Sequence, residues 1–142
     1  MKRITFTIII VAVLTTFPRG QTSDTADRLV LWRIVHEYCV PASKQGQNPT
    51  PCALVDNERG YAILKDKTGS SQFLLIATAK VSGIEDPELL KADSPNYFAE
   101  AWEARRFVSA MRMRDLPRDI FSLAVNSKDK RSQDQLHIHM AY

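Results

Sequence analysis

The chain has 142 residues, enough for one domain, with 44% hydrophobic residues and a formal net charge of +3. Lys2, Arg3 and Arg19 account for this charge, so the remaining 16 basic residues balance 16 acidic residues. A balanced body creates no electrostatic field that would attract a nucleic-acid backbone. The composition therefore argues against a nucleic-acid partner.

The first twenty residues have the composition of an export signal. A basic start, Met1-Lys2-Arg3, precedes an apolar run over residues 4–17 that only threonines interrupt. As a helix this run would cover about 21 Å, less than the roughly 30 Å hydrocarbon core of a bilayer. No clear small-residue cleavage site follows. We expect residues 1–20 to be a signal peptide or membrane anchor, and residues 21–142 to be the exported domain.

Apolar residues of the first predicted helix recur at helical spacing after N-cap candidates at residues 23–25. They form one stripe that would face a core: Leu31, Ile34, Val35 and Tyr38. His36 falls outside this stripe, which predicts a histidine on the surface.

The two cysteines, Cys39 and Cys52, flank a polar segment that contains three prolines and one glycine. An even number of closely spaced cysteines in an exported protein predicts a disulfide. Closing such a loop would stabilise the fold by about 3 kcal/mol. The spacing is not that of a C-x-x-C motif and no histidine lies between the cysteines, so redox chemistry and metal binding are less favoured there.

The middle of the chain predicts a β-hairpin, two helices and a strand. The hairpin strands cover residues 60–65 and 72–77, around an Asp-Lys-Thr-Gly turn. A short helix begins at Pro87, a longer one covers residues 96–113, and alternating apolar residues predict a strand at residues 121–126. The order of elements predicts the α+β class, an antiparallel sheet with packed helices.

The last predicted strand carries two of the three histidines, His137 and His139. Apolar residues alternate with them at 136, 138 and 140, and a period of two is typical of a half-buried strand. Both imidazoles would then project from one outward face, with their backbone positions roughly 6–7 Å apart.

Three kinds of function fit two neighbouring imidazoles on a strand. A neutral imidazole can attack phosphorus while a second one assists, and Asn126, Ser132 and Gln133 would supply donors to the phosphate oxygens. The same pair could bind zinc, but the sequence has no third ligand at a spacing that is typical of zinc sites. It could also be a solvated strand face without chemistry.

The spacing of Asn126, Gln133 and His137-Ile138-His139 resembles the N…Q-x-x-x-H-x-H segment of histidine-triad hydrolases and transferases. Over nearly all of residues 28–140, the chain resembles the bacterial CDP-diacylglycerol pyrophosphatase family. The matching segments are LWRIV at 31–35, CVP at 39–41, NPTPCA at 48–53, GYAILKD at 60–66, SPNYF at 94–98, AWEAR at 101–105 and SLAVNS at 122–127.

The resemblance implies a histidine-triad-like α+β fold in an enzyme of the inner membrane that faces the periplasm. The implied reaction is hydrolysis of the pyrophosphate bond of CDP-diacylglycerol to CMP and phosphatidic acid through a histidine nucleophile. The partners would be this lipid-linked cytidine nucleotide and the membrane surface. No metal or other cofactor is implied.

Two alignments of the histidines with this family compete, because the family has a third histidine where this chain has Gln135. The spacing of the preceding amides makes His139 the nucleophile and His137 its helper, and we prefer this alignment. The other makes His137 the nucleophile. The residues expected to bind the substrate are Asn126, Gln133, Ser132, Gln135 and, from the hairpin, Lys65, for which a solvated lysine is the simpler interpretation.

Relatives of this family continue beyond the histidine strand, so the resemblance predicts a C-terminally shortened member. Two alternatives to the enzyme therefore stay open. One is a weak or inactive remnant that binds a nucleotide or a phospholipid phosphate, and the other is a small zinc protein. A final strand at a free terminus would also suit pairing with a second copy in a homodimer.

Overall fold

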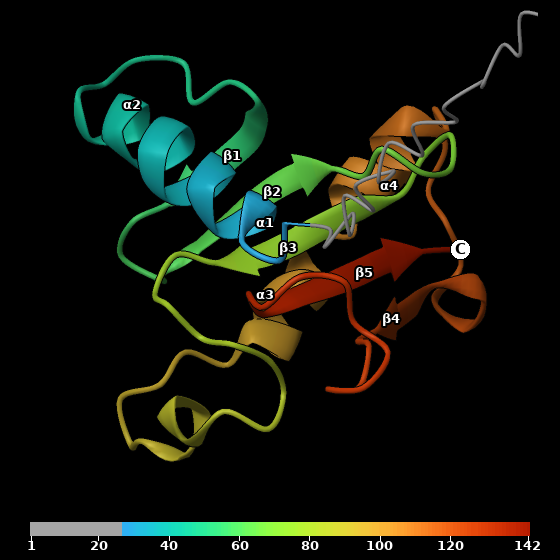
Figure 1. Cartoon of the computed structure of the whole chain (residues 1–142). Helices are drawn as coiled ribbons and strands as arrows, with labels where there is room; N and C mark the ends of the chain where they lie inside the picture. Colours follow the sequence, from blue (N-terminus) through green and yellow to red (C-terminus); the bar gives the residue numbers. More distant parts are fainter. Residues whose placement is uncertain (1–26) are drawn as a thin grey trace, which may run out of the picture.

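The computed structural model describes residues 27–142, and the predicted leader lies outside them. Five strands in this described part form one antiparallel sheet in the order β1-β2-β3-β5-β4. Helical segments pack on both faces of the sheet, as Figure 1 shows. This arrangement confirms the predicted α+β class. No helix among the described residues is long and apolar enough to cross a membrane.

The strands agree with the predicted ones except for an additional first strand. The strands are β1 (Cys52–Asp56), β2 (Tyr61–Lys65), β3 (Phe73–Ala77), β4 (Ser122–Ala124) and β5 (His137–Ala141). The sequence predicts no element between Cys52 and residue 60, and β1 is irregular there, with a register shift between Cys52 and Leu54 in its pairing with β2. The predicted hairpin is therefore two strands of a three-stranded meander.

The helical segments are short and lie either before β1 or between β3 and β4. They are α1 (Val30–Arg33), a π-helical segment (Ile34–Cys39), α2 (Val40–Lys44), a 3₁₀ turn (Pro87–Leu90), α3 (Tyr97–Glu103), α4 (Arg106–Met111) and a second 3₁₀ turn (Arg118–Ile120). The helix predicted over residues 96–113 is thus two helices. The carbonyl of Trp102 accepts from both the backbone N–H and the guanidinium of Arg105, which ends α3.

The π-helical segment corrects the predicted stripe of the first helix. A π-helix takes more residues per turn than an α-helix, so position 38 rotates away from position 35. Val35 and Cys39 are fully buried, whereas Tyr38 is 59% exposed. His36 is on the surface, as predicted, and its ring stacks on that of Trp32 with centroids 4.5 Å apart.

The sheet buries side chains on both of its faces. We call the face under α3 and α4 the apolar face, because its buried residues are almost all hydrophobic: Tyr61, Ile63, Phe73, Leu75, Ala77, Ile138 and Met140. We call the other the histidine face; its β2–β3 half packs Ala62, Leu64, Leu74 and Ile76 against the N-terminal helical segments. The predicted disulfide between Cys39 and Cys52, with a Cα–Cα distance of 5.8 Å, links those helical segments to β1.

The final strand is not at an edge of the sheet. β5 pairs with β3 along one side and with β4 along the other. The backbone groups that we expected to pair with a second copy are therefore already used, and the prediction of a homodimer through this strand is wrong. The edges of the sheet are β1 and β4.

Candidate functional site

Both histidines project from the histidine face, as their spacing predicts. His139 lies opposite Leu74 of β3 and Ala124 of β4, and His137 lies opposite Ile76 of β3. Cross-strand partners share a face, so both imidazoles continue the row that the N-terminal helical segments cover. The expected outward exposure is wrong for His137, which is only 7% exposed, because this face of the sheet is covered too.

The imidazole of His137 is fixed by its own strand. Its Nδ1 lies 2.7 Å from the carbonyl oxygen of Gln135, which can only accept, so Nδ1 carries the proton. Burial lowers the pKa of His137 and the nearby imidazole of His139 lowers it further, against the hydrogen bond to Gln135. A neutral ring with a proton on Nδ1 leaves a free electron pair on Nε2.

The imidazole of His139 lies between a carboxylate and an amide. Its Nδ1 is 3.4 Å from Oδ2 of Asp66, and its Nε2 is 3.4 Å from Nδ2 of Asn126. The rings of His137 and His139 meet edge to face with centroids 5.1 Å apart. The site therefore combines side chains from β5, from the β2–β3 turn and from the segment after β4.

Asp66 is a site residue that sequence analysis missed. Its Oδ1 accepts hydrogen bonds from the backbone N–H and the hydroxyl of Thr68, both at 2.9 Å. Burial alone would raise the pKa of Asp66, but these hydrogen bonds and the neighbouring His139 hold it below its ordinary value. The strand period places Asp66 on the same face as Leu64, but no local signal shows that this strand lies near β5.

The side chain of Gln135 is fully buried beneath the site. Its Nε2 donates to the carbonyl oxygens of Ala77 (2.7 Å) and Ala79 (2.8 Å). Its Oε1 is buried without a hydrogen-bond partner among the described residues. Gln135 thus anchors the start of β5 to the end of β3, and its predicted contact with substrate stays a prediction.

The amide of Gln133 is engaged with the start of the first helix. Its Oε1 accepts from the N–H of Leu31 at 3.0 Å, and its Nε2 donates to the carbonyl oxygens of Asp27 and Ser132. Ser132 itself is exposed. A phosphate-binding role for either side chain stays a prediction, and for Gln133 it would require these hydrogen bonds to be exchanged.

Lys65 does not lie beside the histidines. It pairs with Phe73, which pairs with Met140, so Lys65 projects from the apolar face. Its Nζ donates to the carbonyl oxygens of Asp66 and Gly69 and closes the hairpin turn. The strand pleat thus sends Lys65 to the side of the sheet opposite the histidines, and its predicted contact with a phosphate stays a prediction.

A buried arginine supports the loop that leads into β5. The side chain of Arg131 is 6% exposed and pairs with Glu85 at 2.6 Å and with Asp134 at 3.0 Å. Asp134 also accepts two hydrogen bonds from Arg28, and these two arginines lower the pKa of its carboxyl well below the usual range. A Cβ at Gly83 would lie 2.5 Å from this guanidinium, so a larger residue there would require the arginine side chain to shift.

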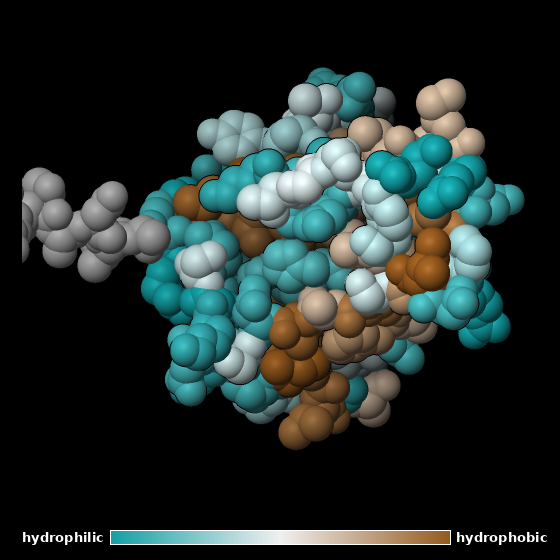
Figure 2. Space-filling view, turned by 90° about the vertical axis from the view of Figure 1, so that its right-hand side faces the viewer, coloured by the Kyte–Doolittle hydropathy of each residue, from teal (hydrophilic) through white to brown (hydrophobic). Residues whose placement is uncertain are grey.

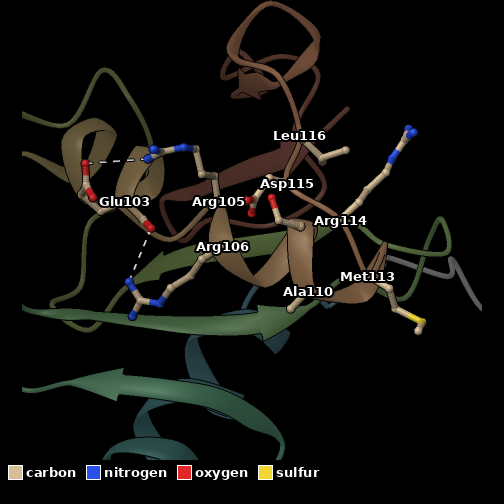
Figure 3. A pocket seen from close by; sticks show the side chains of 9 residues that line it. Glu103, Arg105, Arg106, Ala110, Met113, Arg114, Asp115 and Leu116 are labelled. Atoms are coloured by element: carbon tan, nitrogen blue, oxygen red, sulfur yellow. Dashed lines mark hydrogen bonds and ion pairs between the residues drawn. The ribbon is translucent and has the colours of Figure 1, made fainter.

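A narrow cavity lies between this arginine and the site, and its lining includes Asn126, Arg131, Gln135 and His137. A larger hollow lies elsewhere, around α4 and the residues after it (Figure 3), with a volume of about 830 Å³. Arg105 and Arg106 line this hollow and both contact Glu103. It shares no lining residue with the histidine site. The face in Figure 2 is largely hydrophilic, with its apolar surface gathered in separate patches.

The zinc alternative requires at least one more ligand than the two histidines. Within residues 27–142, no group of three or more histidine, cysteine, aspartate or glutamate side chains is arranged to hold a metal ion.

These features define an α+β domain with two histidines, a carboxylate and an amide gathered on one face of its sheet. The profile of the CDP-diacylglycerol pyrophosphatase family matches residues 26–141, and the chain belongs to this family. A relative from Yersinia pestis named CDP-diacylglycerol pyrophosphatase is 48% identical over 111 residues, covering 78% of this chain and 43% of the relative. The family predicted from the sequence is confirmed. The chain spans less than half the length of that relative.

Proposed function

We propose that this protein hydrolyses the pyrophosphate bond of CDP-diacylglycerol to CMP and phosphatidic acid through a histidine nucleophile, without a cofactor. The observation that carries the proposal is the pair of imidazoles in a chain of this family, one of them buried and neutral with a free Nε2. A neutral imidazole in that form can attack phosphorus without first losing a proton.

The geometry favours His137 as the nucleophile, whereas the spacing of the amides in the sequence favoured His139. The hydrogen bond to the Gln135 carbonyl orients the ring, and the lowered pKa keeps Nε2 unprotonated near neutral pH. The Nε2 of His139 instead faces the amide of Asn126. This choice corresponds to the alignment in which Gln135 replaces the first histidine of the family.

The polar residues near the histidines support binding of a phosphate group. Asn126 is exposed and its Nδ2 lies at the site, so it can donate to a phosphate oxygen. The predicted roles of Ser132, Gln133 and Gln135 in substrate binding are retained as proposals.

We also propose that the domain acts on the exported side of the inner membrane, at the membrane surface. The disulfide between Cys39 and Cys52 supports this location, since disulfides persist in oxidising compartments. Protection of the chain from protease in intact cells, with digestion after the outer membrane is opened, would be the expected result. Digestion only after cell lysis would contradict it.

The activity is tested with the full chain in detergent, incubated with CDP-diacylglycerol and a chelator while CMP release is followed. We expect His137→Ala to reduce the rate at least about 10³-fold and His139→Ala about 10²-fold. His36→Ala is the matched control, because this histidine is exposed outside the site, and it should leave the rate unchanged. A larger loss of rate in His139→Ala than in His137→Ala would identify His139 as the nucleophile instead.

A second candidate function is binding of a nucleotide or phospholipid phosphate without turnover. The observation that favours it is Gln135, which replaces a histidine of the family and whose amide nitrogen already donates to the carbonyl oxygens of Ala77 and Ala79. Absence of CMP release from a folded chain that still binds CDP or CMP would support this function. Release of CMP that depends on the histidines would contradict it.

A further inference from the structure

We propose that Asp66 is a positioning residue that holds His139 as a base, and that His139 takes the proton from the water that completes hydrolysis. This inference rests on the proposed function and assigns His139 a step of its own. It also gives a role to a buried carboxylate that sequence analysis did not include in the site.

The carboxylate of Asp66 is fixed by its turn and aimed at one ring. Its Oδ1 is held by the N–H and hydroxyl of Thr68, and the N–H of Asp66 donates to Gln72 across the hairpin. Its Oδ2 is buried, and no hydrogen-bond donor among the described residues satisfies it. Nδ1 of His139 lies 3.4 Å from this oxygen. A buried carboxylate oxygen without a hydrogen-bond donor lowers the stability of the fold. We therefore infer that the function of this oxygen is its contact with the ring of His139.

The contacts on both sides of the His139 ring agree on one tautomer. A carboxylate only accepts, so the nitrogen that faces Asp66 carries the proton. The amide nitrogen of Asn126 only donates, so the nitrogen that faces Asn126 carries the electron pair. These contacts favour the tautomer with the proton on Nδ1 and a free electron pair on Nε2, beside the other imidazole.

This tautomer suits the second half of a two-step hydrolysis. In the first half, the Nε2 pair of His137 forms a bond to phosphorus, the bridging P–O bond breaks, and its electron pair leaves with the departing phosphate. In the second half, a water oxygen attacks phosphorus while Nε2 of His139 takes its proton. The N–P bond then breaks, and its pair returns to His137. The carboxylate of Asp66 stabilises the imidazolium that forms on His139, as an aspartate does in a catalytic triad.

The Asp66→Asn variant makes a sharp test, because the new amide can keep its oxygen toward Thr68 and place its nitrogen toward His139. A donor at that position requires the opposite tautomer, with the electron pair on Nδ1 and the proton on Nε2. The matched control is Asp56→Asn. Asp56 begins the β1–β2 turn and accepts hydrogen bonds from the N–H groups of Glu58 and Arg59, but no histidine contacts it.

The readout that does not depend on activity is the ¹⁵N spectrum of the His139 ring in the full chain. We expect the Nδ1–H tautomer in the unmodified protein and in Asp56→Asn, and the Nε2–H tautomer in Asp66→Asn. An Nε2–H tautomer in the unmodified protein would overturn the positioning role without any variant. So would a ring in Asp66→Asn that keeps its proton on Nδ1.

The kinetic readout concerns the base. We expect Asp66→Asn to slow steady-state hydrolysis about 10²-fold while the first product still appears in a rapid burst equal to the enzyme present. An unchanged steady-state rate with a changed tautomer would overturn the role of His139 as base. If the unmodified chain releases no CMP, the proposed function fails, and the ¹⁵N spectrum still decides whether Asp66 positions His139.

Discussion

The apolar face of the sheet packs hydrophobic side chains from β2 to β5, whereas the histidine face changes from apolar to polar between β3 and β5. Under α3 and α4, the strands contribute isoleucine, leucine, phenylalanine and methionine, all buried. On the other face, Leu74 and Ile76 of β3 are apolar, but their partners on β5 are His139 and His137. The difference separates two tasks, because one face can supply the free energy of folding while the other carries buried polar groups.

The histidine face is therefore held by directed contacts as well as by apolar burial. A disulfide attaches its helical cover to β1, and the side chains of Gln133 and Gln135 join β5 and its preceding loop to other segments. Buried polar groups destabilise a fold unless their hydrogen bonds are made, so this face depends on the geometry of each contact.

The sharpest test of the comparison is a truncation on each side of β5. Ile138 is fully buried on the apolar face, and Ile138→Ala should lower the free energy of unfolding by about 2–5 kcal/mol through lost burial and a cavity. The control is His139→Ala, one residue away on the histidine face, where the side chain is 31% exposed and about 1 kcal/mol is expected. Urea denaturation measures both. Equal losses would show that the two faces contribute alike.

The disulfide gives the next largest effect. Replacing Cys39 and Cys52 together by alanine opens a loop with a sequence separation of 13 and should cost about 3 kcal/mol. The unmodified protein under reducing conditions should show a similar loss, measured by urea denaturation. If both proteins keep their full stability, the helical cover of the histidine face is held by its apolar contacts alone.

The arginine beneath the histidine loop should contribute less than the disulfide. Arg131→Gln leaves Glu85 and Asp134 without their buried partner, and we expect a loss of about 2 kcal/mol. Arg106→Gln serves as the control, because that side chain is exposed and makes a single long hydrogen bond, and its change should stay within about 0.5 kcal/mol. Thermal unfolding compares the two variants.

The smallest expected effect is a pH dependence that belongs to His137. Its pKa is lower in the folded protein than the ordinary 6.5, so between the two values the unfolded state binds more protons. Stability is full above about pH 6.5 and declines as the pH falls toward the folded pKa. Urea denaturation from pH 5 to 7 should show this slope in the unmodified protein and a shallower one in His137→Gln. Equal slopes would contradict the burial of a neutral imidazole.

Several parts of the site follow from local sequence. The period of two along β5 places His137 and His139 on one face whatever the strand packs against. The turn after β2 is specified by its aspartate, threonine and glycine, and Gly69 adopts the positive φ of 72° that this residue allows. Two closely spaced cysteines in a chain that is expected to be exported predict the disulfide that the structure contains.

Other parts of the site could not be predicted from the sequence, because they depend on which strands become neighbours in the sheet. Two turns of this sheet have an aspartate at their start that accepts hydrogen bonds from the following residues: Asp56, the last residue of β1, and Asp66, directly after β2. Their local chemistry is alike. Only Asp66 meets a histidine, because β5 inserts between β3 and β4 and brings His139 within reach of the second turn.

The sequence by itself determined the class of fold, the pairing of the two imidazoles on one strand and the family. The tertiary structure decided that His137 is buried, that Lys65 points to the opposite face, and that Asp66 belongs to the site. The physical reason is the range of the interactions. Periodicity and turn preferences act over a few residues, whereas burial and cross-strand contacts depend on the order in which distant strands pair.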